Sequence, residues 1–173
     1  MRATALRNFP ISSEDRVLDV GCGTGYATTA LAKRAGTVIG LDQSEDQLHR
    51  ARRNLETGID LARGDAERLP FATNTFDAIW SSGSIEYWPA PTSTLEEFAR
   101  VGRPGAPILL VGPNAPGTNP LQYLADATML VYDHDQARQW CEAAGLVEIE
   151  STTLGPWYAP EVAIVTTARV PSS

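Results

Sequence analysis

The feature that most constrains this chain is a run of ten residues, VLDVGCGTGY, at positions 17–26. Apolar residues lead into a loop with glycine at three alternate positions, Gly21, Gly23 and Gly25. The run predicts a buried parallel strand, a tight loop and a helix that starts near Thr24. Glycines are needed where a Cβ would block the approach of a ligand to the backbone, and the loop amides with the helix N-terminus then offer donors to that ligand.

The glycine spacing differs from the dinucleotide-binding pattern G-x-G-x-x-G. That pattern would need glycine at position 26 or 28, where this chain has Tyr26 and Thr28. Asp19 stands two residues before the first glycine. A carboxylate there would repel a pyrophosphate and attract a cationic or amino-acid end of a ligand. A nicotinamide oxidoreductase is therefore the least favoured enzyme class.

The composition predicts one cytoplasmic domain over residues 1–173. The net charge of −7 disfavours nucleic acid as a partner, because phosphate binding needs a basic surface. The sequence has no apolar run long enough to span a bilayer and no signal-type start, which leaves at most peripheral contact with a membrane. Cys22 and Cys141 fit no zinc spacing, so no metal is expected, and Cys22 is interpreted as a small filler of the glycine loop.

Strands and helices alternate along the chain. Strands are expected at residues 16–21, 37–42, 60–65, 76–81 and 106–111, and helices at 24–35, 44–56, 95–101, 120–130 and 135–144. Two final strands, at 147–153 and 162–170, are expected to form an antiparallel hairpin at the sheet edge. This order predicts an α/β fold with a doubly wound, mostly parallel, seven-stranded sheet, whose ligands bind beyond the carboxyl ends of the strands.

Asp42 ends the second expected strand. An acid at that position can accept both ribose hydroxyls of a nucleotide that lies across the first loop, and Gln43 could line the adenosine. The alternative is that Asp42 caps the following helix, although Ser44 is already placed to do so. After the third strand comes GDAERLPF, at residues 64–71, and after the fourth comes SSG, at residues 81–83.

In this order, the motifs resemble those of the class I S-adenosylmethionine (SAM) methyltransferases. The resemblance implies a Rossmann-like fold with SAM as cofactor, and it implies that Asp65 and the Ala66 amide hold the adenine while Ser82 lies beside the reactive sulfonium. Asp77 is interpreted as structural. The implied cofactor-binding residues are Asp19, Gly21, Cys22, Gly23, Thr24, Gly25, Asp42, Gln43, Asp65, Ala66 and Ser82.

A narrower resemblance rests on WSSGSIEYW at residues 80–88, YLADATMLVY at 123–132, residues 136–145 and GPWY at 155–158. These segments are similar to the methyltransferases of prenylated quinols, of the methyl-phytyl-benzoquinone and demethylmenaquinone types. The resemblance implies methylation of a ring carbon of a lipophilic quinol. The chain departs from the family at Asp133-His134-Asp135, where relatives carry an acidic run, and in its short N-terminus. The short N-terminus leaves two alternatives, a misassigned start codon or a missing helical lid.

A quinol carbon becomes nucleophilic when a neighbouring hydroxyl loses a proton, so a general base is expected. The candidates are Glu86, which could instead be a helix-start acid, and His134 or its neighbour Asp133. Tyr87, Trp88, Trp157 and Tyr158 could form an aromatic wall for a flat ring or serve as ordinary core and rim residues. The apolar segment 121–131 could cover a lipid tail or pack on the sheet.

Two alternatives to the quinol methyltransferase remain open. The first is a SAM-dependent methyltransferase of a small soluble acceptor. The second, from a different class, is a catalytically inactive SAM-binding subunit, which the short N-terminus favours. The sequence does not specify an oligomeric state.

Overall fold

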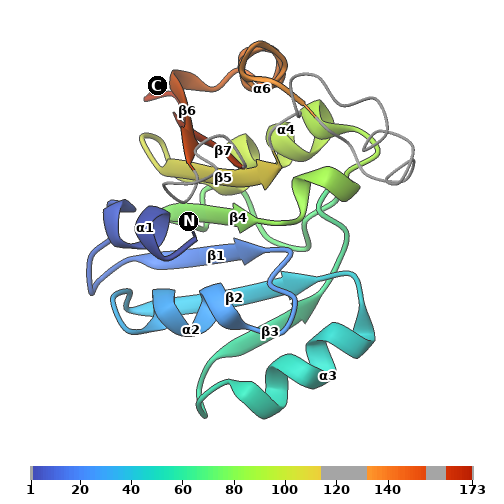
Figure 1. The fold of residues 1–173 in the computed structure, drawn as a ribbon. Coiled ribbons are helices and arrows are strands. Elements are labelled where there is room, and N and C mark those ends of the chain that lie inside the picture. Colours follow the sequence, from blue (N-terminus) through green and yellow to red (C-terminus); the bar gives the residue numbers. More distant parts are fainter. Residues whose placement is uncertain (1, 114–131, 155–162, 173) are drawn as a thin grey trace, which may run out of the picture.

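The computed structural model describes residues 2–113, 132–154 and 163–172. Seven strands form one sheet in the order β3-β2-β1-β4-β5-β7-β6 (Figure 1). The first five strands are parallel to one another, whereas β7 is antiparallel to both β5 and β6. The expected doubly wound sheet and its antiparallel edge pair are therefore confirmed.

The strands are β1 (Arg16–Val20), β2 (Thr37–Asp42), β3 (Asp60–Arg63), β4 (Ala78–Ser82), β5 (Pro107–Pro113), β6 (Val147–Leu154) and β7 (Ala163–Arg169). The helices are α1 (Arg2–Asn8), α2 (Tyr26–Ala32), α3 (Glu45–Asn54), the 3-10 turn η1 (Ile85–Tyr87), α4 (Pro91–Val101) and α6 (His134–Ala143). Most of the expected elements lie within a few residues of these bounds. The helix expected at 120–130 lies outside the described residues.

Each face of the sheet buries its own apolar core, because alternate residues of a strand point to opposite faces. On β1, Leu18 and Val20 belong to one core, which α4 and α6 cover, and Val17 belongs to the other, which α1 and α2 cover. Trp80 of β4 is fully buried on the second face, where Phe9 meets it edge-to-face at 5.5 Å between ring centroids. Both faces are thus closed by helices, and the strand ends are left to form a site.

Local sequence signals account for most helix ends. Ser44 caps α3 by accepting a hydrogen bond from the Gln47 amide at 3.3 Å, as expected. Asp133 and Gln136 form a reciprocal capping box at the start of α6. Helix α4 begins at Pro91, four residues before the expected start, because proline suits the first position of a helix.

Two helical segments were not predicted from the sequence. They are α1, at the N-terminus, and the single turn η1 after β4. Helix α1 packs on α2, and the Arg34 guanidinium fixes it there by donating to the backbone oxygens of Leu6 and Phe9. Both segments are too short to show a helical period, so they depend on tertiary contacts.

Asp77 ties the starts of two parallel strands together. Its carboxylate accepts a hydrogen bond from the Arg16 amide at 2.9 Å and pairs with Arg103. The two contacts anchor β1 beside β4 at the end of the sheet opposite the glycine loop. The structural interpretation of Asp77 is therefore confirmed.

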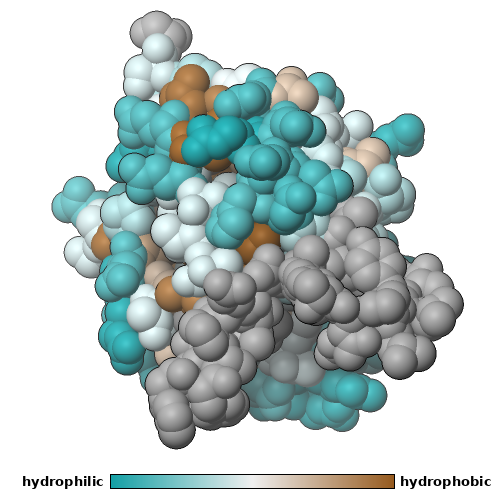
Figure 2. Space-filling view, turned by 45° about the horizontal axis from the view of Figure 1, so that its top comes forward, coloured by the Kyte–Doolittle hydropathy of each residue, from teal (hydrophilic) through white to brown (hydrophobic). Residues whose placement is uncertain are grey.

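Within the described ranges, none of the helices combines the length and apolar character needed to cross a bilayer. Figure 2 turns the top of Figure 1, where α6 and β6 lie, toward the viewer. Hydrophilic residues predominate among the coloured residues of this view, and the hydrophobic ones show as small separate groups.

Candidate functional site

The loop after β1 follows a path that requires its glycines. Gly21, Gly23 and Gly25 have φ values of 71°, 55° and 88°, the left-handed region that glycine adopts without a Cβ penalty. A Cβ on Gly21 would lie 2.3 Å from the Cβ of Ser84, which is too close for any side chain. A Cβ on Gly23 would meet no protein atom within 4 Å. The backbone at Gly23 is therefore open to a ligand.

Asp42 joins this loop to the end of β2. Its carboxylate accepts hydrogen bonds from the Gly23 amide at 2.8 Å and from the Ser44 amide at 2.9 Å. An ionised carboxylate can accept about four hydrogen bonds, so acceptor capacity remains for the hydroxyls of a ligand. The helix-capping alternative is met by Ser44, and Asp42 instead orders the loop across which a nucleoside would lie.

The exit of β4 closes the third side of the site. The Ser81 hydroxyl donates to the Val20 carbonyl at 3.0 Å and lies 2.6 Å from the Ser84 hydroxyl. Ser84 occupies the space that the missing Cβ of Gly21 leaves. These contacts bind the ends of β1 and β4, so the turn η1 starts directly beside the glycine loop.

A cavity of about 280 Å³ lies where these loops meet, beyond the carboxyl ends of β1, β2, β3 and β4. Eight predicted site residues line it: Gly21, Gly23, Asp42, Gln43, Asp65, Ala66, Tyr87 and Trp88. Six further lining residues were not among the predicted site residues: Ser44, Gln47, Gly64, Glu67, Gly83 and Ser84. The last four stand in the motifs GDAERLPF and WSSGSIEYW, whereas no site motif indicated Ser44 or Gln47. The carboxyl ends of strands near a topological switch point are where α/β sheets bind ligands. We call this space the nucleoside cavity.

Tyr87 and Trp88 form one wall of the nucleoside cavity rather than a separate chamber. Trp88 is buried and meets Phe98 of α4 edge-to-face, with 5.6 Å between ring centroids. Tyr87 is 57% exposed, so its ring is free to contact a bound molecule. Trp157 and Tyr158, the other two members of the predicted aromatic wall, lie outside the described residues, as does the segment 121–131.

Five predicted cofactor-binding residues do not line the nucleoside cavity. Asp19 is buried and accepts a hydrogen bond from the Thr28 hydroxyl of α2 at 2.6 Å. Cys22 is buried, and burial, followed by the charges of Asp19 and Asp42, raises the pKa of its thiol, which fits a filler and not a nucleophile. Ser82 is buried in β4, and Thr24 and Gly25 face a different groove. Ligand contacts by these five residues stay predictions.

The three candidate bases lie in two places, and Asp133 is engaged as the N-cap of α6, next to His134. Glu86 is buried in η1 and is not among the described residues that line the nucleoside cavity, and it adds to the effect of burial in raising the pKa of Tyr132. His134 lies at the start of α6, and its Nδ1 is 2.8 Å from the Ser151 hydroxyl of the edge strand β6. The strands β5 and β7 separate β6 from β4, so the structure does not bring His134 to the nucleoside cavity. Both catalytic roles stay predictions.

A clamp of side chains from α4 holds the loop that carries Asp65 and Ala66. Glu97 accepts a hydrogen bond from the Leu69 amide at 2.7 Å and pairs with Arg100 at 2.6 Å. Arg100 donates to the carbonyls of Phe71 and Leu69, at 2.8 and 3.0 Å. In return, Glu67 of the loop accepts from the Ala90 amide at 2.9 Å. No motif in the sequence indicated this clamp.

The chain matches the family described as "methyltransferase domain" over residues 18–110, which is more than half of its length. It belongs to that family. The matched region runs from β1 to β5 and so contains the glycine loop, Asp42, the Asp65 loop and η1. All the described residues that line the nucleoside cavity therefore lie within the matched region.

Three comparisons describe its relatives. The rice protein named 2-methyl-6-phytyl-1,4-hydroquinone methyltransferase 2, chloroplastic, is 40% identical over 163 residues, 91% of this chain and 47% of the relative. Demethylmenaquinone methyltransferase of Staphylococcus saprophyticus is 34% identical over 122 residues, 68% of this chain and 52% of the relative. The chain thus spans about half of the length of these curated relatives.

The third comparison is a solved structure, that of an S-adenosylmethionine dependent methyltransferase from Mesorhizobium loti. It superposes with a TM-score of 0.80 at 22% identity, and the match covers 96% of both chains. This likeness supports the Rossmann-like methyltransferase fold, including the position of the antiparallel strands.

We expect Glu97→Gln to destabilise the protein at neutral pH, because the Arg100 guanidinium lowers the pKa of the Glu97 carboxyl in the folded state. A group with a lowered folded-state pKa stabilises the fold above its unfolded-state pKa, about 4.3, and this stabilisation is lost as pH falls through the folded-state pKa. The expected loss at pH 7 is about 1–2 kcal/mol. The free energies of unfolding of the variant and the wild type, measured by urea denaturation, should therefore become equal in acid.

Glu45→Gln provides the control, since the Glu45–Arg63 pair at 3.0 Å is well exposed on both sides. Exposed ion pairs contribute about 0–1 kcal/mol to the free energy of unfolding, so Glu45→Gln should change stability little. A difference between Glu97→Gln and wild type that persists unchanged in acid would contradict the clamp.

Proposed function

We propose that this protein binds SAM in the nucleoside cavity and transfers a methyl group to a ring carbon of a prenylated quinol. The observation that carries the proposal is the meeting of the open Gly23 backbone, the Asp42 carboxylate and the Asp65 loop around one cavity. The curated relatives named as methyltransferases of a phytyl hydroquinone and of demethylmenaquinone support the acceptor class.

The residues present fit a SAM molecule. Asp42 would accept the ribose hydroxyls, and Asp65, whose Oδ1 already accepts from the Glu67 amide at 3.0 Å, would accept the adenine amine with its remaining capacity. The Ala66 amide and Gln43 lie in the same cavity wall. SAM, when bound, supplies a methyl group on a sulfonium, which an electron-rich carbon can take. The protein's part is to hold the two reactants in line, and orientation supplies much of the rate.

The acceptor side of the proposal rests on Tyr87, Trp88 and Glu86. Tyr87 and Trp88 would contact a flat ring at the cavity wall, where Tyr87 is exposed and Trp88 is held by Phe98. We propose Glu86 as the base that takes the proton of the quinol hydroxyl, since it lies between the cavity residues Ser84 and Tyr87 on one short segment. A base of this kind contributes about 10²- to 10⁴-fold to a rate.

A matched pair of glycine variants tests SAM binding. Gly23→Ala and Gly58→Ala both add a Cβ at positive φ, at positions where it meets no protein atom within 4 Å. Gly23→Ala should lose about 1–2 kcal/mol of stability through the backbone, and Gly58→Ala, whose φ of 101° lies farther from the left-handed minimum, should lose at least as much. Only Gly23→Ala should also lose SAM affinity, by about tenfold or more, because Gly23 lines the nucleoside cavity and Gly58 does not. Calorimetry with SAM, with NAD as the negative ligand, measures this. Equal SAM affinity in the two variants would mean that the loop does not contact the cofactor.

The acceptor is tested by methyl incorporation from labelled SAM. Reduced prenyl-quinones in detergent should be methylated and oxidised ones should not, because only the quinol ionises to an electron-rich ring. Water-soluble catechols ionise too, but they should be poor acceptors because they lack the prenyl tail of the proposed acceptor. Efficient methylation of soluble phenols without quinols would replace the proposal with the small-acceptor alternative. SAM binding with transfer to neither class would favour the inactive subunit.

The general base is tested by comparing Glu86→Gln with His134→Gln. Glu86→Gln should lower kcat by about 10²-fold or more while the Kd for SAM changes little, because the amide cannot take a proton. His134→Gln should retain most activity, since its ring is hydrogen-bonded to the edge strand. A Glu86→Gln variant with unchanged kcat would exclude Glu86 as the base.

A further inference from the structure

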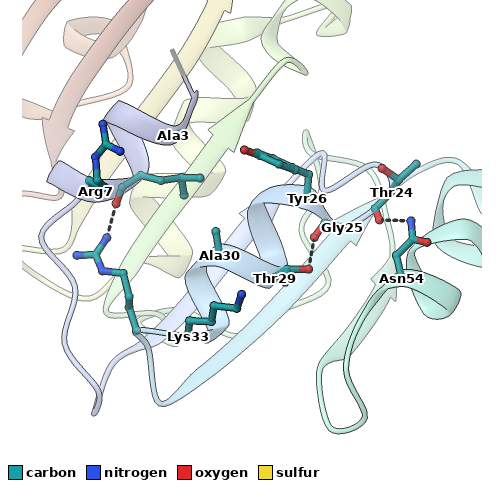
Figure 3. Close-up of a pocket in the computed structure, with 11 residues that line it drawn as sticks. Ala3, Arg7, Thr24, Gly25, Tyr26, Thr29, Ala30, Lys33 and Asn54 are labelled. Atoms are coloured by element: carbon teal, nitrogen blue, oxygen red, sulfur yellow. Dashed lines mark hydrogen bonds between the residues drawn. The ribbon is translucent and has the colours of Figure 1, made fainter.

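A groove of about 620 Å³, larger than the nucleoside cavity, lies between α1 and α2 (Figure 3). Its apolar contributors include Leu6 of α1 and Ala30 and Tyr26 of α2. Tyr26 is 60% exposed, which is a high value for an aromatic residue at the start of a helix. Contact with an apolar ligand would remove this ring and the groove lining from water, and the burial of apolar surface favours binding.

The charges around this groove have one sign. Arg7, Lys33 and Arg34 line it, and none of its lining residues in the described part of the chain is acidic. The bias extends beyond the lining, since residues 1–13 and 20–41 together contain four of the chain's 14 basic residues and none of its 21 acidic ones. In a chain with a net charge of −7, these two segments therefore carry only positive charge.

Two of the three cations are available to a partner. Arg34 is engaged, because its guanidinium donates to the Leu6 and Phe9 carbonyls and so holds α1 on α2. Arg7 and Lys33 are exposed, and neither forms an ion pair with a carboxylate in the described part of the chain. In Figure 3, Arg7 comes from α1, Ala30 and Tyr26 come from α2, and Lys33 directly follows α2.

We propose that this groove docks the protein on an anionic phospholipid bilayer. An acyl chain would lie against Leu6, Ala30 and Tyr26, and Arg7 and Lys33 would bind the lipid phosphate. The apolar lining favours an amphiphile over a small polar anion, and the single sign of charge favours an anionic lipid over a neutral one. Each basic residue near an anionic surface contributes about 1 kcal/mol, which corresponds to roughly a fivefold change in binding. Docking is therefore reversible.

The groove also has a useful place in the molecule. It is lined by Thr24, Gly25 and Tyr26, which directly follow Gly23 of the nucleoside cavity. Docking would thus place the cofactor loop next to the bilayer, where a prenylated acceptor resides. The biological use of docking rests on the proposed function, whereas lipid binding itself requires no methyl transfer.

Co-sedimentation with vesicles tests the proposal. The protein should bind vesicles of equal parts phosphatidylglycerol and phosphatidylcholine, bind pure phosphatidylcholine vesicles weakly, and lose affinity for the anionic vesicles as salt rises. Arg7→Gln/Lys33→Gln should weaken binding on the order of 25-fold. Tyr26→Ser should weaken it at low and high salt alike, because it removes an apolar contact.

The control is Arg52→Gln/Arg53→Gln, which removes the same charge from two exposed residues of α3. This variant should retain nearly all vesicle binding, and thermal unfolding should show that both double variants are folded. Equal binding to neutral and anionic vesicles, or equal loss in the two double variants, would overturn the proposal.

SAM calorimetry on the same proteins separates this inference from the proposed function. The Arg7/Lys33 variant should bind SAM with unchanged affinity, because neither residue lines the nucleoside cavity. A protein that binds anionic vesicles but not SAM would refute the proposed function and leave docking intact. One that binds SAM but not vesicles would refute docking alone.

Discussion

The hydrogen bond between the Gly23 amide and the Asp42 carboxylate is the contact on which the rest of the site depends. It joins the ends of β1 and β2, which are neighbours in the sheet, at the point where their loops diverge. The amides of Gly21 and Cys22 add to it by donating to the Leu41 carbonyl at 2.8 and 3.0 Å. A loop of three left-handed glycines is entropically costly to order, and these bonds are what hold it in one conformation.

The remaining walls of the cavity are held by one lining residue and by one pair that lies outside the cavity. Ser84 fills the space beside Gly21, and the pair of Glu97 and Arg100 on α4 fixes the loop that carries Asp65. These residues position the groups that would contact a ligand. A substitution at Glu97 would therefore alter the cavity without altering any residue that lines it.

The sequence predicted the features that are local and missed those that are not. Alternating apolar residues, the Ser44 cap and the glycine loop each appear within a few residues, so β1, β2 and α3 could be placed before the structure. The clamp joins residues about 30 positions apart, Leu69 and Phe71 with Glu97 and Arg100, and no local pattern encodes that pairing. Helix α1 was missed for a related reason, since it is held by contacts with Arg34 and not by its own period.

The position of β7 has a consequence for how this protein is made. β7 follows β6 in the chain but lies between β5 and β6 in the sheet, with hydrogen bonds to both. During synthesis, β5 emerges long before the strand that covers its edge, so its unpaired backbone is exposed until β7 is complete. An uncovered apolar strand edge is a template for pairing with other chains. The nascent protein therefore depends on its late C-terminal strand to avoid aggregation, even though that strand contributes nothing to the nucleoside cavity.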